Sequence, residues 1–378
     1  MLRNRDTGNS KLDHILRHNK AKKQNLTVLR NRQHVNMIQM RHLFATGLLA
    51  IVSSVGMAQH RHFQVTPLIE SDGGSLFRIL DTGISLKLND QGMVSGTART
   101  NGLANSFAYT KAAGLQLLSS GTNTLQTTFY SPKPNNMVYY MDSQKVARWS
   151  FESGMQVIHT FAEMPGKSVT DFDTHHNLLM YVPSKQSLTL YGPRGVLGSF
   201  VLPTGFGLFG MSDNDVVIGE VVSNGGGNLK GMSPVAWSPS LGLLYMPALQ
   251  GTQGSSVLGI NSIGTVCGAS YLNNSAGIVP YVWQPGGNPT QLIGADNWSY
   301  AEGVSSNGLV VGESDLGPVY WDAPDNPLLL DDMWDHNGDP TLHLLWVSDV
   351  NSKGQIVGFM STDPTGKRGW MFLADPLD

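Results

Sequence analysis

A nine-residue motif recurs along the chain and constrains its fold more than any other feature. An apolar residue is followed by an Asn/Ser-x-x-Gly turn, a β-branched run and a closing glycine. Asn and Ser favour such turns, and Gly tolerates the positive φ that they require. Each copy therefore predicts a hairpin, with the closing glycine at a bulge or a close backbone approach. The copies are Leu88–Gly96, Ile260–Gly268, Val304–Gly312, Val350–Gly358 and Met211–Gly219. In Met211–Gly219, Asp215 replaces the turn glycine.

A second half-motif, a short apolar strand that ends on an aromatic residue, follows each copy. A Pro/Gly turn and another apolar strand come next, so each unit has room for about four strands. We expect the aromatic residues to pack between neighbouring units; exposed aromatics that stack on a sugar are the alternative. The instances are Phe107–Tyr109, Val235–Trp237, Tyr281–Trp283, Val319–Trp321 and Trp370–Phe372.

Two weaker copies bring the number of units to seven. Asn136–Tyr140 with Val146–Trp149 and Asn177–Tyr181 with Leu188–Tyr191 both lack the closing glycine. The predicted first turns lie at positions 89, 133, 174, 212, 261, 305 and 351. Four-stranded units at spacings of about 40 to 50 residues are typical of a β-propeller, because a single sheet cannot bury both of its faces. The predicted fold is all-β, a seven-bladed β-propeller of four-stranded blades; a β-helix or an open β-sandwich array is the alternative.

These units resemble the repeats of the bacterial extracellular HAF-repeat proteins. The resemblance rests on Asp349–Gly358 and Ala301–Gly312 and covers roughly residues 76–376. This sequence differs from the family at the His-Ala-Phe triplet that gives the family its name, which is present here only as Ser106-Phe-Ala. The resemblance implies export and a propeller-like repeat fold, and it supplies no catalytic residues.

Residues 40–58 have the pattern of a secretion signal. Arg41 and His42 form a basic n-region, Leu43–Val55 is apolar, and Gly56–Ala58 offers small residues for cleavage before Gln59. A transmembrane anchor is the alternative, although a span needs about 20 apolar residues. The prediction is therefore a secreted or periplasmic protein, preceded by a disordered or signal N-terminus and with no membrane span in its mature form.

The predicted domains follow from this pattern. Residues 1–36 are expected to be a disordered basic extension or to lie before the true start codon, residues 37–58 the signal peptide, 59–75 a linker and 76–378 the seven-repeat propeller. Of the 25 basic and 28 acidic residues, ten and two lie in residues 1–58. The remainder carries a net charge of −11 and would repel a polyanion, so nucleic-acid binding is not expected.

The sequence predicts no catalytic residue. It contains no His-Glu-x-x-His, Gly-x-Ser-x-Gly, phosphate-binding loop or Cys-x-x-Cys motif. Gly205, Gly207 and Gly210 match a dinucleotide-binding pattern, but a blade turn follows instead of the helix that such a site requires. The single cysteine, Cys267, is expected to be a buried, inert thiol. His175 and His176 are adjacent, so on a strand they cannot bind one metal together.

Acidic residues offer two weaker candidates. Asp335, Asn337 and Asp339 alternate like the oxygen ligands of a calcium loop, but Pro340 stands where the glycine of the sharp turn belongs. A solvated turn is the alternative. Asp171 and Asp173 would share one face of a strand, with a turn-capping or exposed pair as the alternative. No other cofactor is predicted.

Two classes of function remain. The first is a monomeric binding scaffold without catalytic activity, whose propeller-face loops contact a protein or a glycan. The second is an enzyme acting on polysaccharide, with a glycosidase- or lyase-like carboxylate site near the central channel. Two carboxyl groups from different blades in one concave pocket would favour the enzyme.

Overall fold

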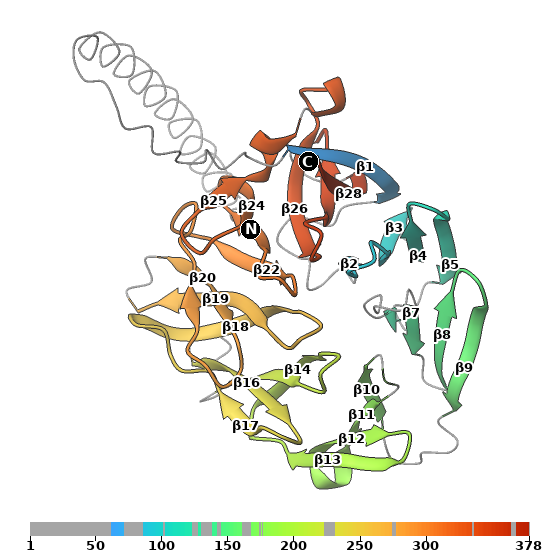
Figure 1. The fold of residues 1–378 in the computed structure, drawn as a ribbon, viewed down its shortest axis with the longest axis vertical. Coiled ribbons are helices and arrows are strands. Elements are labelled where there is room, and N and C mark those ends of the chain that lie inside the picture. The colour runs from blue at the N-terminus through green and yellow to red at the C-terminus, as the bar shows by residue number, and fades with distance from the viewer. Residues whose placement is uncertain are drawn as a thin grey trace, which may run out of the picture. The chain divides into compact units, whose positions relative to one another are not determined.

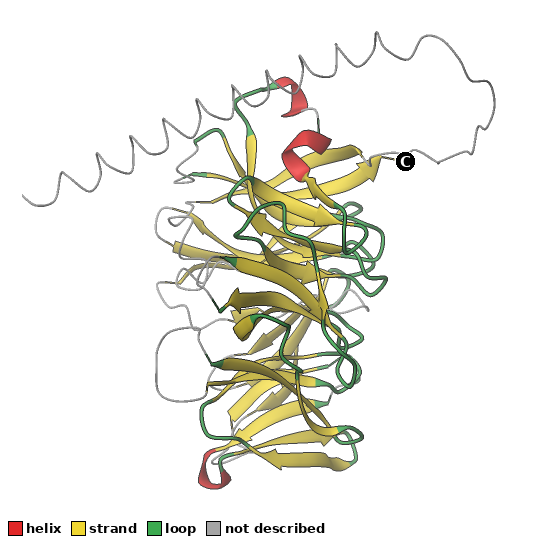
Figure 2. Cartoon of the chain, turned by 90° about the vertical axis from the view of Figure 1, so that its left-hand side faces the viewer, coloured by secondary structure: helices red, strands yellow, loops and turns green. Residues whose placement is uncertain are grey.

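The computed structural model describes residues 62–71, 86–100, 103–122, 128–129, 138–141, 145–160, 168–173, 175, 177–222, 231–273, 277–334, 336–363 and 368–377. In these ranges the chain forms strands and three short 3-10 segments: η2 (Pro183–Lys185), η3 (Leu330–Met333) and η4 (His336–Gly338). Figure 2 shows these strands from the side. No helix within these ranges is long and apolar enough to span a membrane.

Seven four-stranded antiparallel sheets are arranged around an axis, which confirms the predicted seven-bladed propeller (Figure 1). We number the blades 1 to 7 by their innermost strands, which are β2 (Leu86–Leu88), β6 (Thr128–Phe129), β10 (Ser168–Phe172), β14 (Phe206–Met211), β18 (Thr252–Ile260), β22 (Tyr300–Val304) and β26 (His343–Val350). The second strands are β3 (Val94–Thr100), β7 (Val138–Met141), β11 (Leu178–Val182), β15 (Val217–Val222), β19 (Val266–Leu272), β23 (Val310–Ser314) and β27 (Ile356–Ser361).

The remaining strands lie toward the rim of the ring. The third strands are β4 (Leu103–Thr110), β8 (Lys145–Ser150), β12 (Ser187–Gly192), β16 (Met232–Ser238), β20 (Ile278–Trp283), β24 (Gly317–Trp321) and β28 (Gly369–Leu377). The outer strands are β5 (Gly114–Thr122), β9 (Gly154–Thr160), β13 (Gly195–Val201), β17 (Gly242–Tyr245), β21 (Thr290–Gln291), β25 (Pro327–Leu329) and β1 (His62–Ser71).

The order of strands in blade 7 corrects one predicted boundary. Residues 59–75 were expected to be a linker, but β1 (His62–Ser71) pairs antiparallel with β28 (Gly369–Leu377) and is the outer strand of the last blade. The last repeat has only three strands of its own, so its edge is covered by the strand that precedes the first repeat. The predicted extension and signal, residues 1–58, lie outside the described residues.

The aromatic residues of the third strands pack between blades, as predicted. Trp283 of blade 5 lies in one cluster with Ile218 of blade 4, and Trp321 of blade 6 lies in one with Cys267 of blade 5. Phe107 of blade 1 joins the core of blade 7. Each interface therefore buries the face that a single sheet would leave in water.

The closing glycines lie where a neighbouring strand comes very close. A Cβ built on Gly312 would collide with the carbonyl oxygen of Tyr300, and one on Gly358 with that of Trp346. The irregularity in the register falls on the inner strand opposite, between Ala301 and Gly303 in blade 6. The predicted close approach is confirmed at these positions, and the bulge lies on the partner strand.

Candidate functional site

The first turns of six blades share one hydrogen bond, which the side chain that opens the turn accepts from the backbone N–H four residues later. In blade 1 the Asn89 Oδ1 atom accepts the backbone N–H groups of Gln91 and Met93, at 3.1 and 2.8 Å. This local bonding gives the backbone groups of the turn partners that do not depend on the rest of the fold. The residues in this role are Asn89, Asp173, Ser212, Asn261, Ser305 and Asn351.

Neighbouring turns are also hydrogen-bonded to one another, from blade to blade. Each of these bonds joins residues that are far apart in the sequence, so the turns hold one another in place at one end of the ring. The bonds run from Asn351 Nδ2 to the Asn89 carbonyl (2.9 Å), from Ser352 N–H to Asp90 Oδ1 (2.8 Å), from Asn261 Nδ2 to the Ser305 carbonyl (2.9 Å) and from Asp213 N–H to the Ser262 carbonyl (3.0 Å).

A cavity of about 240 Å³ lies at this end, inside the ring of turns. We call it the axial pocket. Its wall comes from the inner strands and first turns of six blades, so no single repeat contains the site. The lining residues with polar or aromatic side chains are Lys87, Asn89, Asp90, Asp171, Phe209, Ser212, Asp213, Asn261, Ser262, Ser305, Ser306, Asp349 and Asn351.

Two pocket carboxylates, Asp171 and Asp349, occupy equivalent places two residues before a turn. Asp171 Oδ2 accepts the Met211 N–H of the next blade at 2.6 Å, and Asp349 Oδ2 accepts the Leu88 N–H at 3.1 Å. Burial raises the pKa of Asp349, and nearby Lys87 opposes that rise. Carboxyl groups from different blades thus line one concave pocket, but these two also join neighbouring inner strands.

The predicted Asp171 and Asp173 pair does not act as a unit. Asp173 opens the turn of blade 3 and accepts the N–H groups of His175 and Asn177, at 2.9 and 2.8 Å. Asp173 therefore caps a turn, as one of the alternatives predicted. Both carboxylates are buried, so the alternative of an exposed pair is wrong. Burial, and then a hydrogen bond with Asp215, raises the pKa of Asp173 from 3.8 to about 6.

Two glutamates of blade 6, one on the inner strand β22 and one on the second strand β23, are half-buried. Burial raises the pKa of Glu302 to about 7, and burial together with Glu302 raises that of Glu313 to about 8. The sequence-based prediction missed both residues. A signal was present, since Glu302 interrupts an otherwise apolar inner strand and Glu313 follows the closing Gly312.

The other sequence candidates are dispersed. Asp339 is exposed, and its Oδ1 accepts the Thr341 N–H and Oγ1–H at 2.9 and 2.7 Å, contacts that lower its pKa and hold a turn. Asp335 and the side chain of Asn337 lie outside the described residues, so the calcium site stays a prediction. His175 is exposed beside Asp173, and His176 also lies outside the described residues.

Two further predictions can be compared with the structure. Gly207 and Gly210 lie in strand β14, which excludes the helix that a dinucleotide site would need. Cys267 is fully buried, and burial raises its thiol pKa well above the usual value, as expected of an inert thiol.

Among the described residues, one group could hold a metal ion: Asp331, His336 and His343.

No protein-family model and no curated protein matches the chain. Several solved structures are similar to the chain in fold. An inactive variant of virginiamycin B lyase from Staphylococcus aureus with quinupristin has a TM-score of 0.51 and 9% identity, over 84% of this chain and 100% of that one. An oligogalacturonate lyase in complex with manganese has a TM-score of 0.50 and 13% identity, over 84% and 98%.

A third similar structure is the β-propeller domain of the trilobed protease from Pyrococcus furiosus, with a TM-score of 0.46 and 9% identity over 84% of this chain and 94% of that one. At identities this low, the first two likenesses support the propeller fold alone.

Proposed function

We propose that this protein is an exported binding protein that receives the end of a neutral glycan in the axial pocket. The observation that carries the proposal is Phe209, an aromatic side chain 40% exposed among the polar groups of the pocket. A sugar has an apolar ring face that packs on an aromatic ring, and hydroxyl groups that bond to carboxylates, amides and backbone carbonyls.

The charge of the pocket supports a neutral ligand. The pocket is lined by four carboxylates and by Lys87, the one cation among the lining residues; the carboxylates are those of Asp90, Asp171, Asp213 and Asp349. Such a wall repels phosphate, sulfate and uronate groups. The volume of about 240 Å³ is smaller than a typical pocket for a drug-sized ligand, so it suits one terminal unit of a longer chain.

The pocket is also held in one conformation before any ligand arrives. The turns that line it are joined by hydrogen bonds between blades, so binding orders few of their groups. Preorganisation of this kind supports recognition by a rigid frame.

A glycan array and a peptide pull-down with residues 59–378 test the proposal. We expect binding to neutral glycans, weakened about tenfold or more by Phe209→Ala because the aromatic face is lost. Tyr245→Ala is the matched control, since Tyr245 is an exposed aromatic on the outer strand β17. The absence of binding to every glycan on the array would contradict the proposal. Capture of a basic peptide instead would favour a protein partner.

A polysaccharide-cleaving enzyme is the second candidate, favoured by Asp171 and Asp349, which line the axial pocket from different blades, and by Glu302 of strand β22, whose last residue, Val304, also lines it. A carboxyl with a pKa of about 7 can act as a general acid near neutral pH. Activity would then fall as the pH rises through about 7, and Glu302→Gln would abolish it while Glu152→Gln, on an exposed loop, would not. Release of reducing ends from neutral polysaccharides measures it; no release by the wild type would exclude this candidate.

Export is part of the same proposal. The signal-like residues 37–58 and the resemblance to HAF-repeat proteins support it, and cleavage before Gln59 would leave β1, which begins at His62, intact in blade 7. N-terminal sequencing of protein recovered from outside the cytoplasm should give Gln59 first. An unprocessed N-terminus on the exported protein would contradict the predicted signal.

A further inference from the structure

The connection from blade 6 to blade 7 holds a small polar cluster apart from the axial pocket. Segments η3 and η4 lie between the outer strand β25 and the inner strand β26. Leu330, Met333 and Trp334 are buried in the core of these blades, and Trp334 forms a bridge with Phe63 of β1. The connection is therefore anchored on both sides of residue 331.

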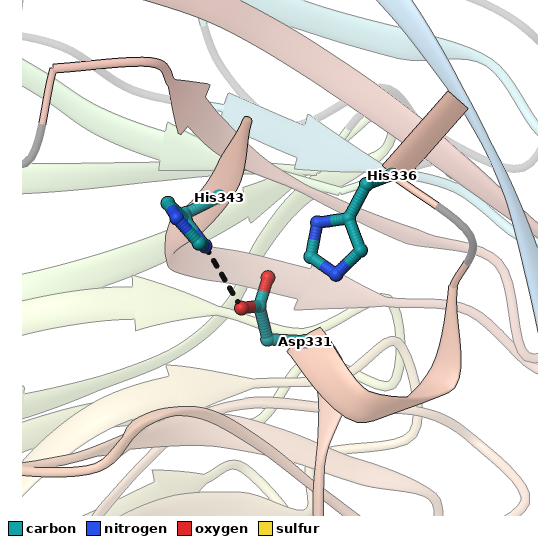
Figure 3. Close-up of side chains that lie close together, drawn as sticks. All are labelled: Asp331, His336 and His343. Carbon is teal, nitrogen blue, oxygen red and sulfur yellow. Dashed lines mark hydrogen bonds and ion pairs between the residues drawn. The ribbon is translucent and has the colours of Figure 1, made fainter. Parts of the chain in front are cut away.

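Asp331, His336 and His343 project from this connection toward one another (Figure 3). One ligand atom of each lies within 4.8 Å of the others, and Asp331 Oδ2 is 3.1 Å from His343 Nδ1. The other oxygen of Asp331 accepts the Trp334 Nε1–H at 3.3 Å and the Leu344 N–H at 3.2 Å. These bonds orient the carboxylate so that Oδ2 faces the histidines.

The hydrogen bond of His336 fixes its tautomer. Its Nδ1 atom lies 2.7 Å from the Leu342 carbonyl oxygen, which can only accept, so Nδ1 carries the proton and Nε2 keeps its lone pair. Histidines that bind metals commonly donate their other ring N–H to a backbone carbonyl in this way. The ring also packs against Trp334, with centroids 4.9 Å apart.

The backbone conformation of His336 sets the direction of its side chain. Its φ is +55°, in the left-handed region, where Asn, Asp and His occur more often than other non-glycine residues. An ion pair between His343 and Asp331 would not require this conformation. With this backbone, the ring of His336 lies on the same cluster as Asp331 and His343.

We propose that Asp331, His336 and His343 bind one divalent transition-metal ion of the zinc class, with a fourth position open to water. Two imidazoles and one carboxylate suit zinc and similar metals, whereas calcium takes oxygen ligands. Zinc bonds of about 2.0 to 2.2 Å place tetrahedral ligands on the order of 3.3 Å apart. Asp331 Oδ2 and His343 Nδ1, 3.1 Å apart, meet this spacing, and the ligand atom of His336 lies within 4.8 Å of both.

The metal would join the blade 6–7 connection to the start of β26. His343 begins that eight-residue strand and Val350, which lines the axial pocket, ends it. At about 3.3 Å per residue the two sites lie roughly 23 Å apart. The metal site therefore stands or fails independently of the proposed glycan site.

Zinc titration of the full chain, after removal of metals with a chelator, tests the proposal by calorimetry. We expect His336→Asn and His343→Gln each to weaken one site by about 10- to 100-fold or more. Asn tolerates the left-handed backbone at position 336, so the loop keeps its conformation. His175→Gln is the matched control, because His175 is an exposed histidine beside an aspartate with no second histidine described near it.

Two further readouts separate a metal site from a merely structural cluster. Zinc should raise the Tm of the wild type and of the control more than that of either variant. Cobalt should give the visible absorption of a four-coordinate ion only where the site is intact. Identical zinc isotherms for wild type and both variants, or a response to calcium but not to zinc, would overturn the proposal.

Discussion

Single side chains decide the conformation of each first turn. Asn, Ser and Asp are interchangeable at its opening position because each offers an oxygen to the backbone N–H groups that follow. The residue near the end of the turn has positive φ, +91° at Gly92 and +90° at Gly308, with Asp215 at +60°. The side-chain acceptor and the positive φ are both local requirements, so the turn motif can be recognised in the sequence.

The buried opening residue should contribute much more to stability than an exposed neighbour. Asn351 accepts the N–H groups of Lys353 and Gln355 and donates to the Asn89 carbonyl. Asn351→Ala leaves these groups without partners and should lower the free energy of unfolding by about 2 kcal/mol. Gln91→Ala, at an exposed turn position, is the control and should cost less than about 0.5 kcal/mol. Urea denaturation measures both, and equal effects would contradict the prediction.

The pH dependence of stability should show Asp173. Its pKa is raised from 3.8 to about 6 in the folded state, so between these values the folded protein holds more protons than the unfolded one. The associated stability is present below pH 4 and is lost as the pH rises through about 6. Asp173→Asn keeps the turn acceptor and should be more stable than wild type by about 1–2 kcal/mol at pH 7.5.

Thermal or urea unfolding from pH 4 to 8 measures this difference. The two proteins should converge as the pH falls toward 4, because folded Asp173 is then protonated and the unfolded carboxyl, with its pKa of 3.8, is close to half protonated. A difference that is constant with pH would show that another effect of the substitution dominates.

At the scale of strands, acidic side chains join neighbouring blades. Glu220 of β15 accepts the Val257 N–H and the Ser256 Oγ–H of β18, next to the register shift between Val257 and Gly259. Glu313 makes the equivalent bond to Val347 of blade 7. An inner strand with a bulge leaves a backbone donor out of its own sheet, and the preceding blade supplies the acceptor.

Removal of such an acceptor should weaken one interface. Glu220→Ala leaves the buried Val257 N–H without a partner and should lower the free energy of unfolding by about 2 kcal/mol. Glu152→Ala, at an exposed turn, should have no measurable effect. Hydrogen exchange would locate the change, with faster exchange in blades 4 and 5; uniform loss of protection would argue against a local role.

At the scale of the molecule, the ring is closed by strand β1. Its pairing with β28 runs from His62 opposite Leu377 to Ser71 opposite Gly369, so the C-terminal strand ends beside the start of β1. Closure also includes the bond from the Leu88 N–H to Asp349 between blades 1 and 7. The stability of the ring therefore depends on non-covalent contacts between the two ends of the repeat array.

A permuted chain tests this closure. A protein that starts at residue 72 and carries residues 62–71 after a short Asn-Gly linker at its C-terminus should fold with a Tm within a few degrees of the wild type, because the linker suits a tight hairpin. Deletion of residues 62–71 should lower the Tm far more, since it exposes the edge of β28. Equal stability of the deletion and the permutant would show that β1 is dispensable.

The sequence by itself determined the hairpins, the seven repeats and the aromatic contacts between blades, because turn chemistry and hydrophobic pattern are local and repeated. The weak copies around Tyr140 and Tyr181 were still recognisable, since strands β7 and β11 keep their apolar character. The resemblance to a repeat family agreed with this pattern and added nothing to the site.

Only the tertiary structure decided where the chemistry lies. Asp349 meets Leu88, Asn351 meets Asn89, and Phe63 meets Trp334, each across most of the chain, so no spacing in the sequence could place them together. The raised pKa values of Glu302 and Glu313 come from burial against other blades. His336 and His343 lie near Asp331 because the connection folds back on itself, and local rules describe a turn but not what that turn brings together.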